Sequence, residues 1–171
     1  MFINVVKNKL RFCYDNSGIY NSHTVINCVP FNNLIKVDYS PLKKYINIFD
    51  VEKGKNYSIK YLLGLLNSTL ISWYFRFFLS EGVHCYPNDA KQLPIRTIEF
   101  SKPKEKKMHD DLVAMVDRML KLQKKYHSTR LEHDKKLYKN QIDHLDNQID
   151  TLVYKLYGLT EGEIKIVEKQ K

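Results

Sequence analysis

Two charged triplets are the first residues in the chain that could do chemistry. Metal-dependent nucleases hold their metal ions with carboxylates and often use a (D/E)xK triplet. Glu105-Lys106-Lys107 and Asp134-Lys135-Lys136 match this pattern. Both triplets fall in charged segments with a helical repeat rather than on an expected strand, and such matches arise there by chance. We therefore do not expect nuclease activity from this chain.

Histidine and cysteine offer few further ligands. His84 is followed by Cys85, but a zinc ion needs three or four ligands, and no HExxH motif is present. The three cysteines have no short spacing, so we expect buried, reduced thiols rather than disulfides or a zinc cluster. We expect the histidines of the charged segments to be solvated: His109, His127, His133 and His144.

Motifs for nucleotides, cofactors and acyl transfer are missing from the sequence. There is no GxGxxG, GxxxxGK[ST] or GxSxG. An amino-methyltransferase would need an Asn/Asp-Pro-Pro-aromatic motif, and Tyr86-Pro87-Asn88-Asp89 is not one. We therefore expect neither a catalytic centre nor a bound cofactor in this chain.

The charge of the chain favours a polyanionic partner. Its 171 residues carry 28 Lys and Arg against 19 Asp and Glu, a net charge of +9, and 43% are apolar, enough for a core. Nucleic acid and an acidic membrane face both fit this charge. No apolar run reaches the length of a membrane span and no signal peptide is visible, so we expect a cytoplasmic protein without membrane contact.

The first part of the sequence predicts an α+β domain with a small mixed sheet and buried helices. Residues 2–6 and 9–14 alternate like half-buried strands, 15–18 form a turn, and 19–29 are again β-prone. Ser58 is an expected cap for a helix, and Asn67-Ser68 separates it from a second apolar helix. Trp73, Phe75, Phe77 and Phe78 are expected in the core. Residues 80–93 are expected to form a loop and 94–98 a strand, with Arg11 and Arg96 facing structural carboxylates.

The last third predicts an antiparallel helical hairpin. Apolar residues recur at spacings of 4 and 3 from Met108 to Tyr126 and again from Tyr138 to Leu156. Gly158 is expected to end the second helix, and Thr160 with Glu163 forms a capping box for a short third one. We place the domain boundary at residue 100, giving a domain over 1–100 and a hairpin region over 101–171.

The order of four segments resembles a known family. LLGLLNSTLISWYF (62–75), QLPIRTI (92–98), a long helix, and IDTLVYKLYGLTEGEIKIVE (149–168) follow one another as in the TaqI-like C-terminal specificity domain of adenine-specific DNA methyltransferases and fused type II restriction–methylation enzymes. The opening segment KNKLRFCYDNSGIYNSHTVINCV is also similar. The resemblance implies a target-recognition domain for double-stranded DNA. It also implies a partner methyltransferase domain in a parent chain, which would use S-adenosylmethionine.

A DNA-recognition domain needs cations for phosphates and short polar side chains for base edges, on loops held by a rigid scaffold. The candidate phosphate contacts are Lys7, Lys9, Lys36, Lys43, Lys44 and Lys91. The candidate base contacts are Asn32, Asn33, His84, Tyr86, Asn88 and Gln92. Turn formation competes as an explanation for the asparagines, and solvation for the lysines.

Two rival interpretations stay open at this point, besides the nuclease considered above. Type I specificity subunits share the Asn-Ser helix, the Leu-Pro-Ile segment and a spacer helix. A protein-assembly module could use the helices to bind a partner or to form a homodimer, with incidental basic charge. In the DNA-binding interpretation, the lysines at the start of the hairpin could reach the DNA backbone: Lys102, Lys104, Lys106 and Lys107.

Overall fold

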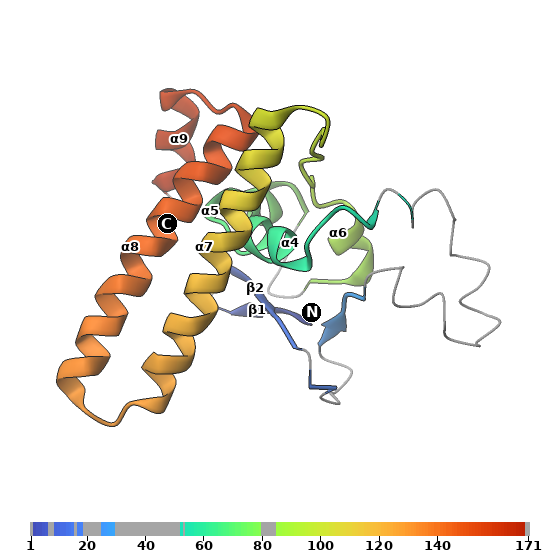
Figure 1. Ribbon diagram of the computed structural model, residues 1–171. Helices are drawn as coiled ribbons and strands as arrows, with labels where there is room; N and C mark the ends of the chain where they lie inside the picture. Colours follow the sequence, from blue (N-terminus) through green and yellow to red (C-terminus); the bar gives the residue numbers. More distant parts are fainter. Residues whose placement is uncertain are drawn as a thin grey trace.

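A computed structural model of the chain describes residues 2–6, 9–15, 17–18, 25–29, 52, 54–79 and 85–169 (Figure 1). Most of these residues are helical, so the predicted α+β fold is confirmed in part. The small sheet has three strands in the order β2-β1-β3, and all its described pairs are antiparallel, whereas we expected a mixed sheet. The division of the chain at residue 100 stays a prediction.

The sheet begins with the two strands that the alternating pattern predicted. β1 (Phe2–Val6) pairs with β2 (Lys9–Cys13), and β3 (Ile26–Asn27) pairs with the other edge of β1. On β2 the side chains of Leu10 and Phe12 are buried, while Arg11 and Cys13 are exposed. This alternation turns one face of β2 toward the helices and the other toward solvent.

Two apolar helices form the centre of the molecule. α4 (Ile59–Leu66) starts at Ser58, whose hydroxyl accepts a hydrogen bond from the Lys60 N–H at 3.2 Å. α5 (Thr69–Tyr74) follows and widens into the π-helix η1 (Phe75–Leu79). α4 packs against β2 and α7, and α5 packs against β2, α8 and α9. The two central helices therefore connect the sheet to the C-terminal helices.

The C-terminal helices form the expected antiparallel pair, seen in yellow to orange in Figure 1. α7 (Pro103–Ser128) and α8 (Glu132–Tyr157) are joined by three residues and lie side by side. α8 ends at Gly158, which has a φ of 69° in the left-handed region, as predicted. α9 (Glu161–Glu168) begins with the predicted capping box of Thr160 and Glu163.

α4 and α7 approach closely at Gly64. A Cβ atom on Gly64 would lie 2.9 Å from Leu112 Cδ1 and 2.9 Å from Val116 Cγ2. We expect Gly64→Ala to lower the free energy of unfolding by about 1–2 kcal/mol, because overpacking of about 1–3 kcal/mol exceeds the helix-propensity gain of about 1 kcal/mol. Denaturant unfolding measures this change.

Gly162→Ala is the matched control for this substitution. Gly162 is also helical, but a Cβ there would meet only Thr160 Oγ1, at 4.0 Å. The control should leave stability unchanged or slightly raised. If Gly64→Ala were equally harmless, the contact between α4 and α7 would have room for a Cβ atom.

Candidate nucleic-acid interface

Residues 86–92 form a short helical turn where the sequence predicted a loop. α6 (Pro87–Lys91) starts with Pro87, whose fixed φ suits the first helical position. The Asp89 carboxylate accepts a hydrogen bond from the Tyr86 N–H at 2.8 Å, and the Asp89 and Ala90 N–H groups donate to the Tyr86 carbonyl at 3.0 and 3.1 Å. The loop prediction was therefore wrong here, because Asp89 caps a helix that begins at the proline.

Four of the predicted DNA contacts come together on this turn. The Tyr86 side chain is 63% exposed, and Asn88, Lys91 and Gln92 are also exposed. The Gln92 Nε2 donates to the Asn88 carbonyl at 3.2 Å, and Leu93, directly after them, is buried in the core. α6 thus presents an aromatic ring, two amides and a cation to solvent from a backbone that the core holds in place.

Of the other predicted DNA contacts, one lies in the sheet. Lys9 lies in β2, opposite Val6. The remaining ones fall outside the described residues: Lys7, Asn32, Asn33, Lys36, Lys43, Lys44 and His84.

Residues 94–98, which follow α6 after Gln92 and Leu93, do not form the strand that we predicted. Tyrosine hydroxyls take the place of a neighbouring strand. Tyr157 donates its hydroxyl hydrogen to the Pro94 carbonyl at 2.5 Å and accepts from the Arg96 N–H at 3.2 Å. Tyr61 donates to the Arg96 carbonyl at 2.8 Å, and Tyr57 accepts from the Ile98 N–H at 2.7 Å.

The hydroxyls of Tyr61 and Tyr157 are held in their neutral form. Burial, reinforced by neighbouring tyrosines, raises the pKa of Tyr61 far above its usual value, and burial also raises the pKa of Tyr157. Both rings therefore remain hydrogen-bond donors over the whole neutral range. The segment after α6 is consequently fixed to α4 and α8 by side chains that cannot lose their protons there.

Arg96 extends this connection to the hairpin. Its Nε donates to the Leu156 carbonyl at 3.0 Å, and its guanidinium lies 3.7 Å from the Glu105 carboxylate. The expected contact with a structural carboxylate is therefore confirmed for Arg96. Arg11, by contrast, is exposed on β2.

Asn67, Ser68 and Thr69 join three parts of the fold. The Asn67 side chain accepts from the Phe12 N–H at 3.0 Å and donates to the Phe12 carbonyl at 2.9 Å, as a neighbouring strand would. Ser68 caps α5, and its hydroxyl accepts from the Ile71 N–H at 3.3 Å. The buried Asp150 of α8 accepts from the Thr69 N–H at 2.8 Å and from its hydroxyl at 2.6 Å. These residues thus connect β2, α5 and α8.

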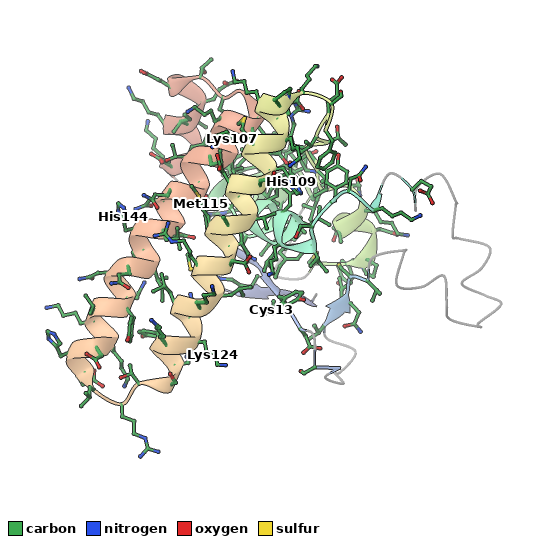
Figure 2. All side chains as sticks on the ribbon, viewed as in Figure 1. Cys13, Lys107, His109, Met115, Lys124 and His144 are labelled. Atoms are coloured by element: carbon green, nitrogen blue, oxygen red, sulfur yellow. The ribbon has the colours of Figure 1, made fainter. Side chains whose placement is uncertain are left out.

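His109 is not the solvated side chain that we expected. It is buried against the rings of Tyr57, Tyr61 and Phe100 (Figure 2). Its Nε2 accepts from the Ser58 N–H at 3.3 Å, so Nδ1 carries the proton and faces Asp110 at 2.9 Å. The sequence did not reveal this role, because the histidine stands among exposed charges on α7. Its contacts make it a structural residue at the start of α4.

The two carboxylate triplets do not meet in one centre. Glu105 lies in the first turn of α7 and Asp134 in the first turn of α8, at opposite ends of the antiparallel pair, which are separated by roughly 35 Å at 1.5 Å per residue. Glu105 accepts a hydrogen bond from the Glu99 N–H at 3.0 Å. Within the described part of the chain, no three His, Cys, Asp or Glu side chains are grouped to hold a metal ion.

The cysteines differ in their surroundings. All three are free thiols; Cys28 and Cys85 are half-buried, whereas Cys13 is exposed, contrary to our expectation, because it lies on the solvent face of β2. Burial, with a contribution from the Asp89 carboxylate, raises the pKa of Cys85 to about 11. The Cys85 thiol is therefore neutral near pH 7 and a weak nucleophile.

The aromatic end of the second apolar helix is less buried than we expected. Phe75 belongs to the core, but Phe77 and Phe78 are 50% and 63% exposed because the segment leaves the core after Phe75. Their rings pack against Trp73 at 5.5 and 5.6 Å. The prediction that all four aromatic residues are core was therefore wrong for Phe77 and Phe78.

The membrane test gives a simple result for the described residues. No single helix among them has both the length and the apolar character of a membrane span. Only the bent pair of Ile59–Leu66 with Thr69–Leu79, taken together, reaches the required length and composition.

Comparison with known proteins identifies what the chain resembles. The family model of the TaqI-like C-terminal specificity domain matches residues 40–95, a range that includes α4, α5, η1 and α6. The chain is 28% identical over 130 residues to the type II restriction enzyme and methyltransferase RM.Eco57I of Escherichia coli. This match covers 71% of the chain but only 13% of the relative. No solved structure matches significantly.

The family-model match falls on two of the segments that carried the resemblance in the sequence. The Asn-Ser helices and the start of the Leu-Pro-Ile segment lie inside the matched range. The prediction of the family is therefore confirmed: the chain is similar to the TaqI-like C-terminal specificity domain of bacterial restriction–modification proteins.

Proposed function

We propose that this chain recognises a specific sequence in double-stranded DNA as the specificity region of a restriction–modification enzyme. The match of residues 40–95 to a specificity domain carries this proposal. The parent enzyme would be an adenine-specific DNA methyltransferase or a restriction–methylation fusion. The relative in Escherichia coli is described as a type II enzyme, which favours this parent over a type I specificity subunit.

α6 is the part of the described surface that best suits base recognition. Asn88 and Gln92 are exposed amides, and this type of side chain can form paired hydrogen bonds with adenine in the major groove. Lys91 would contact a phosphate and Tyr86 would stack or wedge at a base step. The buried Leu93 and the tyrosine-bound segment after it support the precise position that such contacts need.

Catalysis in this proposal belongs to another part of the parent enzyme. The six glycines of the chain form no glycine-rich loop, so these residues do not fit a cofactor cradle. S-adenosylmethionine would bind to the methyltransferase domain and supply the methyl group there. The chain covers 13% of its relative, and its own task would be to grip the duplex and present the target site to that domain.

Selection from duplexes with a randomised core tests this function. We expect the chain to enrich a defined sequence, and Asn88→Ala/Gln92→Ala to lose about 1–3 kcal/mol of discrimination at the affected base pairs. Lys91→Ala should weaken binding to every duplex about equally. Sequencing of the bound fraction and titration of single duplexes measure the two effects separately.

Gln148→Ala is the matched control for the loss of an exposed amide. Gln148 lies on α8, where its side chain contacts His144 at 3.1 Å, far along the chain from the matched range. This control should retain the selected sequence. Binding without any sequence preference, in the unchanged chain, would contradict the proposed function.

A further inference from the structure

The two ends of the helical pair differ sharply in charge. Residues 102–117 hold four lysines and four acidic residues, a net charge of zero. Residues 118–140, which include the connection between α7 and α8, hold eight Lys and Arg against two acidic residues, a net charge of +6. Two thirds of the net charge of the chain therefore lies at this connecting end, which extends beyond the sheet in Figure 1.

The lysines at the start of α7 are largely neutralised by the protein itself. Lys106 pairs with Asp110 at 2.6 Å and Lys107 with Asp111 at 2.8 Å, each one helical turn further on. Lys102 pairs with Glu99 at 2.5 Å. These exposed ion pairs place a carboxylate beside three of the four lysines, so this end carries little excess positive charge for the DNA backbone.

The connecting end has the opposite arrangement. Six exposed cations there form no ion pair within the described residues, and we call them the distal basic cluster: Arg118, Lys121, Lys124, Lys125, Arg130 and Lys136. Lys121 and Lys125 are four residues apart on α7, where two like charges repel each other. Figure 2 shows Lys124 near the end of α7.

Helix stability does not account for this cluster. The helix dipole favours cations only in the last turn of α7, which reaches Lys125 but not Arg118 or Lys121. Lys136 lies in the second turn of α8, where the dipole does not favour a cation either. The same helix that begins with attractive pairs thus ends with repulsive ones, and an external anion would relieve that repulsion.

We infer that the distal basic cluster binds the phosphate backbone of the DNA duplex outside the bases that are read. From Arg118 to Lys125 the helix rises about 10 Å at 1.5 Å per residue. Duplex DNA carries one negative charge per roughly 1.7 Å of its axis, so several phosphates lie within that length. This inference rests on the proposed function for its partner, but the cluster would bind duplexes of any sequence.

Salt-dependent titration of the whole chain with duplex DNA tests this binding. Arg118→Gln/Lys121→Gln/Lys124→Gln should lower affinity by about tenfold or more at roughly 0.1 M salt, and reduce the slope of log K against log salt by about 2 to 3. The control is Lys104→Gln/Lys155→Gln/Lys165→Gln, which removes three exposed cations away from the cluster. It should change affinity by less than about twofold and the slope by less than about 1.

The outcomes separate this inference from the proposed function. Equal losses in the two triple variants would show that only net charge matters, and would overturn the cluster as a site. No DNA binding by the unchanged chain would also overturn the inference. Unchanged DNA affinity in the variant Arg118→Gln/Lys121→Gln/Lys124→Gln would overturn it as well, and would favour an acidic protein partner for the cluster. Sequence preference in the randomised pool should survive in the distal variant. If the unchanged chain showed no sequence preference, the proposed function would be refuted. The salt dependence of DNA affinity would still test whether the distal basic cluster binds the backbone.

Discussion

Replacement of Asp150 by alanine is expected to lower the free energy of unfolding by about 3 kcal/mol. Asp150 is 3% exposed and accepts hydrogen bonds from the N–H and the hydroxyl of Thr69. Hydrogen bonds to charged groups contribute about 1.5–3 kcal/mol each, and a donor left buried without a partner costs about 1–3 kcal/mol. The loss should appear as a lower midpoint in urea with an unchanged slope.

Asparagine at the same position separates the charge from the hydrogen bonds. Asp150→Asn keeps an acceptor for the Thr69 N–H, and its amide can donate to the Thr69 hydroxyl, so we expect a loss of about 1 kcal/mol. Asp143→Asn is the surface control, because Asp143 is exposed and its ion-pair partner among the described residues is Lys139 on the same helix. It should cost less than about 0.5 kcal/mol. If Asp150→Ala also cost less than about 0.5 kcal/mol, Thr69 would have found other hydrogen-bond partners.

The sequence allowed the regular helices to be predicted because their signals are local. Ser58, Gly158 and the pair Thr160 and Glu163 each act within one helical turn, and all are found where the pattern placed them. The antiparallel pair of α7 and α8 followed from two apolar seams of similar length. Local hydrogen bonds and periodic burial are both visible in a single sequence.

The elements that were wrongly predicted depend on distant partners. Pro94–Ile98 has the composition of a strand, but its backbone pairs with the hydroxyls of Tyr61 and Tyr157, 35 and more residues away. His109 stands among exposed charges on α7 but is buried because α4 begins beside it. No periodic pattern encodes such contacts. One signal was available for Asp150: it follows Ile149 and precedes Val153 in the apolar seam, where an acidic residue needs a buried partner.

The candidate interface could be predicted only in part. Composition and loop position led to Tyr86, Asn88, Lys91 and Gln92, which the structure brings together on α6. The distal basic cluster is not apparent from the net charge of the whole chain, because acidic residues elsewhere offset it. Their positions matter more, since helical neighbours neutralise Lys106 and Lys107, whereas Lys121 and Lys125 have no acidic partner among the described residues. Only the placement of charges in space shows where a polyanion could bind.

The connection between the sheet and the helices leads to the second large stability prediction. We expect Asn67→Asp to lower the free energy of unfolding by about 3 kcal/mol near pH 7. Asn67 Nδ2 donates to the carbonyls of Phe12 and Leu63 at 2.9 and 3.0 Å, while its Oδ1 accepts from the Phe12 N–H. A carboxylate keeps the acceptor but places negative charge against two carbonyl oxygens that have lost their donor.

The pH dependence of this loss tests the explanation. The new carboxyl would be destabilised in its charged form, so its pKa in the folded protein should exceed its value of about 4 in the unfolded chain. Protonation then returns one donor, and the difference in stability from the unchanged protein should shrink as the pH falls through that raised pKa. Asn67→Ala should lose about 2 kcal/mol at every pH, and the exposed Asn56→Asp should lose less than about 0.5 kcal/mol. Parallel losses for Asn67→Asp and Asn67→Ala across the pH range would mean that the side chain of Asn67 fills space but does not hold β2. A loss that shrinks only in the aspartate variant would instead show that the hydrogen bonds of this amide help to hold β2 against α4.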